Sequence, residues 1–267
     1  MSHNTAIEVV WTVVPTILVV FIFWIGLKGY LTLATPPGDA YTVDVEARQW
    51  SWSFYYPTAG VDSDELHVPP NVPIQLRMRS VDVLHAFFVP AFRVKNDIVP
   101  GKLSGLWFEA TDPGRYQIFC AEYCGEKHSD MLSIVEVHPS REDFDEWLAR
   151  AGSFPDAMPA AERGEILYKK KGCIQCHTLD GVESTGPTWK GLWIKEADRR
   201  QATRIPVLVD GDMKEIVRDE AYLEESMKNP AAKLARSKEG YVNRMSIIRL
   251  KPEEIIYLIE FIKSLGE

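Results

Sequence analysis

The least polar part of the chain lies close to its N-terminus. Residues 9–27 read V-V-W-T-V-V-P-T-I-L-V-V-F-I-F-W-I-G-L and contain no charged side chain. A run of this length can cross the hydrocarbon core of a bilayer as a helix. A secretory signal peptide fits less well, because no Lys or Arg precedes the run and no small-residue cleavage site follows it. We therefore expect a membrane-spanning helix over about residues 9–33, within an N-terminal region of residues 1–38.

The pattern changes to short runs of β type after P-P-G at residues 36–38. Turn-forming residues separate these runs, as in P-P-N at 69–71 and D-P-G at 112–114. Several short strands at this spacing are typical of a β-sandwich or a Greek-key barrel, which we expect over residues 39–139. The expected strands are residues 41–47, 50–55, 74–79, 85–89, 106–110, 116–119 and 132–137.

Helical patterns follow in the last part of the chain. We expect a helix over residues 140–151 with Ser140 as its N-cap, then a linker that ends at residue 160. Residues 161–267 are expected to form an all-α module whose last helix covers residues 252–265 and has one apolar face. A chain of 267 residues has room for two such domains and a membrane element.

Charge is spread unevenly between these parts. Residues 1–159 contain 11 Lys and Arg against 20 Asp and Glu, whereas residues 160–267 contain 19 against 18. Neither part is strongly basic, so a nucleic-acid partner is not expected. The triple lysine at residues 169–171 stands out in the second part. It either directs that domain towards the acidic first part or solvates a helix.

The stretch C-A-E-Y-C-G-E-K-H-S-D-M at residues 120–131 carries a metal-binding pattern. Thiolates, an imidazole and a thioether are the ligands of cupredoxin-type copper, and His85 offers a second imidazole. A single copper needs only one thiolate, so the pair predicts two bridged coppers. A disulfide or two core cysteines would explain neither the histidine nor the methionine. The expected ligands are His85, Cys120, Cys124, His128, Met131 and a backbone carbonyl.

The pentad C-I-Q-C-H at residues 173–177 is the attachment signature of c-type haem. Cys173 and Cys176 would form the thioethers, and His177 would be the proximal ligand. A thioredoxin-type C-x-x-C is the alternative, but that motif does not need the adjacent histidine. The distal ligand must come from further along the chain.

Three downstream methionines are candidates for the distal ligand. Met213 follows a D-G turn in a polar stretch, and Met227 lies in an amphipathic stretch where a core position is expected. Met245 comes just before the last helix and is the predicted ligand. Small monohaem cytochromes c usually have Met-Pro there, whereas this chain has Ser246.

The pattern C-x-E-x-C-x3-H-x2-M, with H-x-F-x-x-P upstream, resembles the CuA domain of subunit II of haem–copper cytochrome oxidases. With C-I-Q-C-H after it, the chain resembles the caa-type subunit II, which is fused to a cytochrome c domain. The resemblance covers nearly the whole chain. E-V-V-W-T-V-V-P is similar to the second transmembrane helix of that family, whose first helix this sequence does not include.

The resemblance implies roles for several further residues. Trp50, in Q-W-S-W-S-F-Y-Y, matches the tryptophan at which electrons enter. Glu8 matches a glutamate near the entrance of a proton path into subunit I. Glu122 would give its carbonyl to copper and its carboxylate to magnesium at the subunit interface. The segment V-K-N-D-I-V-P-G, with Lys95, Asp97 and Gly101, matches a signature that faces subunit I.

The implied function is electron transfer within a respiratory cytochrome c oxidase of the bacterial cytoplasmic membrane. Electrons would pass from a donor, such as a cytochrome c or another redox protein, through haem c and CuA to catalytic subunit I, and other oxidase subunits would be partners too. Oxygen reduction and proton translocation would occur in subunit I. In this family haem c is attached outside the cytoplasm. Both cofactor domains would therefore lie on the outer, periplasmic side of the membrane.

Two other functions remain open at this stage. The chain is also compatible with a CuA-bearing small subunit of a nitric oxide reductase, which the identity of the partner subunit would distinguish. A copper-delivery or redox-sensing membrane protein is the other alternative, although delivery has no use for haem. His3, His67 and His138 belong to no motif and are expected at the surface.

Overall fold

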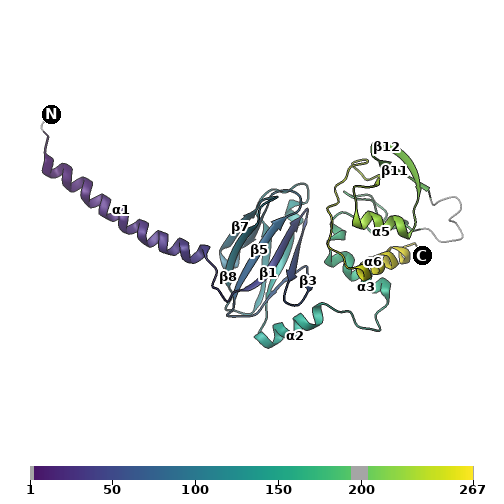
Figure 1. Ribbon diagram of the computed structural model, residues 1–267, viewed down its shortest axis with the longest axis horizontal. Helices are drawn as coiled ribbons and strands as arrows, with labels where there is room; N and C mark the ends of the chain where they lie inside the picture. Colours follow the sequence, from purple (N-terminus) through teal and green to yellow (C-terminus); the bar gives the residue numbers. More distant parts are fainter. Residues whose placement is uncertain (1–2, 194–203, 267) are drawn as a thin grey trace.

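The computed structural model describes residues 3–193 and 204–266. Helix α1 (Thr5–Ala34) contains the expected span and has no buried residue. It is long and apolar enough to cross a membrane. The Asn4 side chain caps its first turn by accepting a hydrogen bond from the Ile7 amide. Figure 1 shows α1 leaving one side of a β-sandwich, with the C-terminal part of the chain on the other side.

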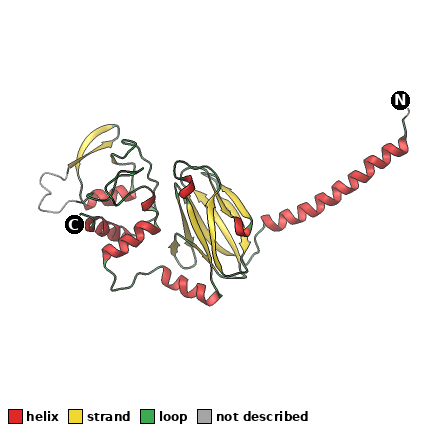
Figure 2. Ribbon diagram, turned by 180° about the vertical axis from the view of Figure 1, so that it is seen from behind, coloured by secondary structure: helices red, strands yellow, loops and turns green. Residues whose placement is uncertain are grey.

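The sandwich consists of two five-stranded sheets (Figure 2). One sheet has the order β3-β2-β1-β5-β8 and the other β4-β10-β9-β6-β7. Their bounds are β1 Tyr41–Arg48, β2 Ser51–Tyr56, β3 Val61–Ser63, β4 Leu66–Val68, β5 Pro73–Ser80, β6 His85–Val89, β7 Val94–Ile98, β8 Ser104–Glu109, β9 Gly114–Cys120 and β10 Leu132–Val137.

The seven expected strands are present, and three more were not predicted. The additional strands are β3, β4 and β7, and each lies at an edge of its sheet. Edge strands pair on one side only, and two of these have just three residues, so their pattern is weak in the sequence. Inward-facing side chains such as Phe54, Leu76 and Ile118 are fully buried between the two sheets.

Helix α2 (Arg141–Ala151) confirms the helix expected after the last strand. Ser140 caps it by accepting from the Asp143 amide. Phe144 is fully buried and meets Tyr41 edge-on, with ring centroids 5.6 Å apart. The helix therefore packs on the sandwich core.

The surface position expected for His67 and His138 is wrong. His138 is buried, and its Nε2 lies 3.1 Å from Nδ1 of His67. The His67 ring stacks on Trp147 of α2 at 3.9 Å. β4 and β10 pair in parallel, which brings the two imidazoles together under the helix. That contact depends on tertiary pairing and leaves no local pattern in the sequence.

The C-terminal part has its own core, built mainly by helices. α3 (Ala160–Lys170) packs against α6 (Pro252–Ser264), and α5 (Glu220–Lys228) adds Tyr222, Leu223 and Met227. The helical fold class is confirmed. A hairpin, β11 (Arg204–Val209) and β12 (Asp212–Val217), was not predicted, and β13 (Leu234–Ala235) pairs with β11.

Candidate functional site: two redox-cofactor sites in contact

The loop between β9 and β10 gathers the thiols, imidazoles and thioether expected at copper. Sγ of Cys120 lies 3.7 Å from Sγ of Cys124 and 3.2 Å from the Glu122 carbonyl oxygen. Sγ of Cys124 is 3.3 Å from Nδ1 of His128 and 3.8 Å from Sδ of Met131. All the predicted ligands on this loop therefore converge.

His85 comes to this loop from β6, the strand next to β9. Its Nδ1 lies 3.9 Å from Sγ of Cys120, and its side chain is fully buried. Together His85, Cys120 and Cys124 place three ligand atoms within 4.8 Å of one another. Because β9 continues antiparallel into β10, the amide of Cys120 bonds to the carbonyl of Met131 and closes the loop at its base. Rigid strands thus hold both sides of the site.

Hydrogen bonds set the protonation of these ligands. Nε2 of His85 lies 2.8 Å from Asp82, which leaves Nδ1 facing the thiols. Burial lowers the pKa of His85, but the bonds to Asp82 and Cys120 outweigh it and raise the pKa overall. The hydrogen bond between the two thiols lowers the pKa of Cys120 and raises the pKa of Cys124. Cys120 is therefore the thiol of the pair that more readily supplies a thiolate to a metal.

The turn between β1 and β2 contacts the loop of residues 120–131, called the copper loop below. Trp50 is buried, and its indole N–H donates to the Cys124 carbonyl at 3.2 Å. Gln49 donates to the same carbonyl at 2.7 Å. Gly125 allows this approach, because a Cβ there would lie 2.8 Å from the Gln49 amide nitrogen and its φ is +120°. Asp82 and Gln49 were missed because their contacts depend on the folded sheet.

The C-I-Q-C-H loop forms the proximal side of a second site. Nδ1 of His177 lies 2.8 Å from the Pro187 carbonyl oxygen, so this nitrogen carries the proton and Nε2 keeps its lone pair. Burial lowers the pKa of His177, although the bond to Pro187 opposes it. Gly186 lets the backbone approach, since a Cβ there would lie 2.7 Å from the imidazole. The histidine is thus held neutral, as an iron ligand requires.

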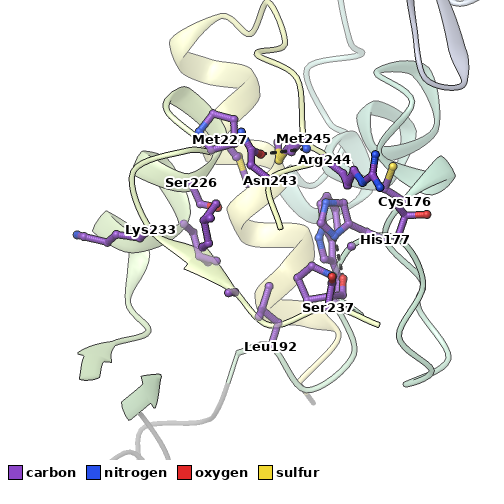
Figure 3. Close-up of a pocket in the computed structure, with 18 of the residues that line it drawn as sticks. Cys176, His177, Leu192, Ser226, Met227, Lys233, Ser237, Asn243, Arg244 and Met245 are labelled. Carbon is purple, nitrogen blue, oxygen red and sulfur yellow. Dashed lines mark hydrogen bonds between the residues drawn. The ribbon is translucent and has the colours of Figure 1, made fainter. Parts of the chain in front are cut away.

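A cleft of about 860 Å³, partly open to solvent, begins at this histidine. His177, Met227 and Met245 all line this cleft, as labelled in Figure 3. Met227, on α5, is also buried in the core of the C-terminal domain, as expected. Met213 lies on β12 with 54% of its surface exposed and does not line the cleft.

The copper loop touches the haem-attachment loop. Lys127 donates to the Gln175 carbonyl oxygen and lies 3.3 Å from Oγ of Ser184. Lys171 is buried between the domains, 3.5 Å from Asp62 of β3 and 3.1 Å from Glu254 of α6. The triple lysine therefore does not simply solvate a helix. It contributes one buried inter-domain ion pair.

The remaining predicted residues lie on the membrane helix, on the copper loop and around β7. Glu8 is in the first turn of α1. Glu122 is half-buried on the copper loop. Lys95 and Asp97 are exposed on β7, and Gly101 follows in the next turn with a φ of +76°.

The matched families agree with this architecture. The family described as cytochrome C oxidase subunit II, periplasmic domain, matches residues 58–138, and the cytochrome c family matches residues 161–266. An apolar N-terminal helix, a cupredoxin-like domain and a cytochrome c domain define a membrane-anchored redox protein. These two families imply CuA copper and haem c, and the donor sets described above fit both.

Individual relatives identify the family. The cytochrome c oxidase subunit 2 of Cereibacter sphaeroides is 31% identical over 206 residues, or 61% of this chain and 68% of that protein. The cytochrome c oxidase subunit 2 of Synechocystis sp. is 40% identical over 148 residues, or 51% of this chain and 44% of that protein. The chain belongs to the cytochrome c oxidase subunit II family.

A solved structure is similar to less than half of this chain. The periplasmic domain of subunit II of cytochrome oxidase from Bradyrhizobium japonicum is 33% identical, with a TM-score of 0.42, over 44% of this chain and 96% of that one. The first relatives are longer than their matches: 44% of the Synechocystis protein and 59% of the Alkalihalophilus pseudofirmus protein are covered.

Proposed function

We propose that this chain carries electrons from a donor through covalent haem c and binuclear CuA to catalytic subunit I of a bacterial cytochrome c oxidase. Oxygen reduction and proton translocation would then belong to subunit I. The observation that carries this proposal is the contact of Lys127, on the copper loop, with Gln175 inside C-I-Q-C-H. Such a contact brings the two cofactor loops of one chain together and shortens the path for an electron.

The proposed copper ligands are His85, Cys120, Cys124, His128, Met131 and the Glu122 carbonyl. Two thiols 3.7 Å apart suit bridging of two coppers, and each of the two imidazoles lies beside a different thiol. A mixed-valence copper pair held by these residues would supply fast one-electron transfer. The backbone closure at Cys120 and Met131 keeps the donors in place during that transfer.

The proposed haem site uses Cys173 and Cys176 for the thioether bonds, His177 as proximal ligand and Met245 as distal ligand. Met245 is favoured over Met227 because it lies on irregular chain beside the cleft, whereas Met227 fills the helical core. Ser246 then follows the ligand where proline is usual. A thioether ligand would keep the haem potential high, which favours reduction of the haem by the external donor.

Trp50 is proposed as the residue through which electrons enter the copper site. Its indole bonds to the carbonyl of Cys124, and its neighbours Gln49 and Ser51 line a cleft together with Cys176 and His177. The tryptophan therefore belongs to the turn that faces the haem-attachment loop. In this chain the fused cytochrome would be the immediate donor.

The remaining roles concern the assembled oxidase. We assign Glu122 to a magnesium site at the interface with subunit I, and Glu8 to the entrance of a proton path in that subunit. Helix α1 would anchor the chain in the bacterial cytoplasmic membrane, with both cofactor domains on the periplasmic side. Other oxidase subunits and an external electron donor complete the set of partners.

The test is purification of the assembled complex with this chain and with its Cys120→Ser variant. We expect oxygen consumption that the variant loses, and electron paramagnetic resonance of the oxidised complex should show hyperfine coupling shared by two copper nuclei. A signal from one localised copper would contradict the binuclear site. Reduction of nitric oxide without oxygen consumption would favour the nitric oxide reductase alternative.

A further inference from the structure

The last residue of β1, Arg48, is a buried cation with unsatisfied hydrogen-bond donors. Only 5% of its surface is exposed. Its Nη2 pairs with Glu46, whereas Nε and Nη1 have no partner. Among the residues that the structure describes, these are the only buried side-chain nitrogen or oxygen atoms without one. Buried donors of a charged group are normally paired, so an acceptor is expected here.

The negative charges nearby are already shared. Glu46 pairs with Arg79 as well as with Arg48, so one carboxylate serves two guanidinium groups. Asp82 accepts from His85 and from the Gln49 amide. The protein thus leaves the Arg48 cation incompletely neutralised in a place where water is scarce.

Arg48 faces the cytochrome domain. It lines a cleft of about 540 Å³ together with Gly172, Cys173, His177 and Met245. This cleft and the 860 Å³ cleft share Cys176, His177, Trp189, Met227, Arg244 and Met245 in their linings. A residue of the β-sandwich therefore forms part of the wall around the haem-attachment motif.

Other cations at these two clefts have acidic partners. Arg244 pairs with Glu239 at 2.9 Å, Lys233 with Glu225 at 2.5 Å, and Lys171 with Asp62 and Glu254. Arg48 differs from them in having free buried N–H groups. It is the cation of the clefts best prepared to receive another anion.

Haem carries two propionate carboxylates, and arginine is the side chain best suited to a buried carboxylate. We propose that Arg48 binds a propionate of the covalently attached haem, so that the copper domain completes the cofactor site of the cytochrome domain. This inference rests on the haem attachment proposed above. It assigns to Arg48 a role in holding haem that the attachment motif itself does not contain.

The position of Arg48 in the chain gives this bond a second consequence. The next two residues, Gln49 and Trp50, both donate to the Cys124 carbonyl. A haem carboxylate held by Arg48 would therefore fix the same turn that supports the copper loop. Arg48 acts as a positioning residue for the copper site and as a binding residue for haem.

The experiment compares the full chain, loaded with copper and haem, with Arg48→Gln and Arg48→Lys. Resonance Raman spectra report hydrogen bonding to the propionates through their bending mode. We expect this band to move to lower frequency in Arg48→Gln, and the haem potential to fall, because a positive charge near the haem is removed. Arg48→Lys keeps the charge, so its haem potential should stay closer to that of the unaltered chain. Its Raman band should still shift, because the hydrogen bonds of the guanidinium are lost.

Arg249→Gln is the matched control. Arg249 lies at the same domain interface, exposed, with its guanidinium 4.8 Å from the Tyr55 ring centroid. Its replacement should leave the Raman band unchanged. An unchanged band and potential in Arg48→Gln, with the copper signal intact, would overturn the proposal and assign the Arg48 donors to water.

A folding defect and a missing cofactor are recognised separately. If Arg48→Gln loses the copper signal, Arg48→Lys decides the question: a shifted Raman band supports the proposal, and an unchanged band overturns it. If the unaltered chain takes up no haem, the proposed haem function fails and this inference fails with it. Normal haem attachment with an unshifted band overturns the inference alone.

Discussion

In the copper site, each predicted ligand outside the cysteine pair has a donor atom within 3.9 Å of a cysteine sulfur. In the haem site, His177 and Met245 face a cleft of about 860 Å³. The copper loop is closed at its base by paired strands. Residues 242–251, which supply Met245, form neither helix nor strand. The ends of the copper loop are joined by strand pairing, whereas Met245 lies on a segment without strand pairing. We therefore expect the geometry of the haem site to depend more on its cofactor.

Because of this difference, we expect loss of haem attachment to have the largest effect on stability. In a Cys173→Ala, Cys176→Ala variant we expect the cytochrome domain to lose most of its stability, about 5 kcal/mol or more, because a cofactor that binds only the folded state contributes to its stability. The copper domain should still take up copper. Thermal unfolding followed by circular dichroism, with copper content measured in parallel, checks both expectations.

Cys120→Ser removes the copper centre instead of the haem and so tests the copper domain. It should abolish the binuclear centre while the sandwich stays folded, because its core consists of residues such as Phe54 and Leu76.

For the variant without haem attachment, a cytochrome domain that still unfolds cooperatively would contradict the proposed difference between the sites.

Met245→Leu and Met227→Leu address the distal half of the haem site. Met245→Leu should remove the spectrum of methionine-ligated haem and lower the potential by on the order of 0.1 V. Met227→Leu should change the potential little and cost at most about 1.5 kcal/mol as a volume-conserving core change. Spectroelectrochemical titration of each variant measures the effect. Loss of the methionine-ligated spectrum in Met227→Leu would move the ligand to α5.

The sequence alone predicted the site residues that lie close together in the chain. It did not predict those that only the fold brings together. The copper ligands on the loop lie within twelve residues, so their spacing was enough to identify them, and C-I-Q-C-H identified the haem-attachment residues. Arg48, Gln49 and Asp82 could not be predicted, since their roles arise from strands that meet in the fold. The His67–His138 pair was missed for the same reason. The edge strands were missed because two of them have only three residues and each pairs on one side only.

The histidine pair gives a smaller, pH-dependent effect confined to the copper domain. Burial, followed by the nearby His138, lowers the pKa of His67 to about 3. The unfolded chain, with a histidine pKa of about 6.5, then binds more protons than the folded chain between these values. Stability should therefore decrease by roughly 1–4 kcal/mol as the pH falls through that range.

His67→Phe keeps a ring beside Trp147 and cannot take up a proton, so its stability should depend less on pH than that of the unaltered chain. His3→Gln, at an exposed position near α1, is the control and should not change the dependence. Guanidinium unfolding between about pH 4 and 8, followed at the copper absorbance, measures it. Equal slopes for His67→Phe and the unaltered chain would contradict the assignment.

The rate of electron transfer from haem to copper within one chain tests the central claim most directly. Lys127→Gln removes the charged donor between the two cofactor loops, and a bond of about 1.5 kcal/mol corresponds to up to about a tenfold decrease in the docked population and in the rate. Lys169→Gln is the control, because Lys169 points outward and pairs with Glu165 at 2.9 Å. After rapid reduction of the haem, we predict fast oxidation of haem with matching reduction of copper, slowed in Lys127→Gln and unchanged in Lys169→Gln. Copper that stays oxidised while the haem is reduced would contradict the account.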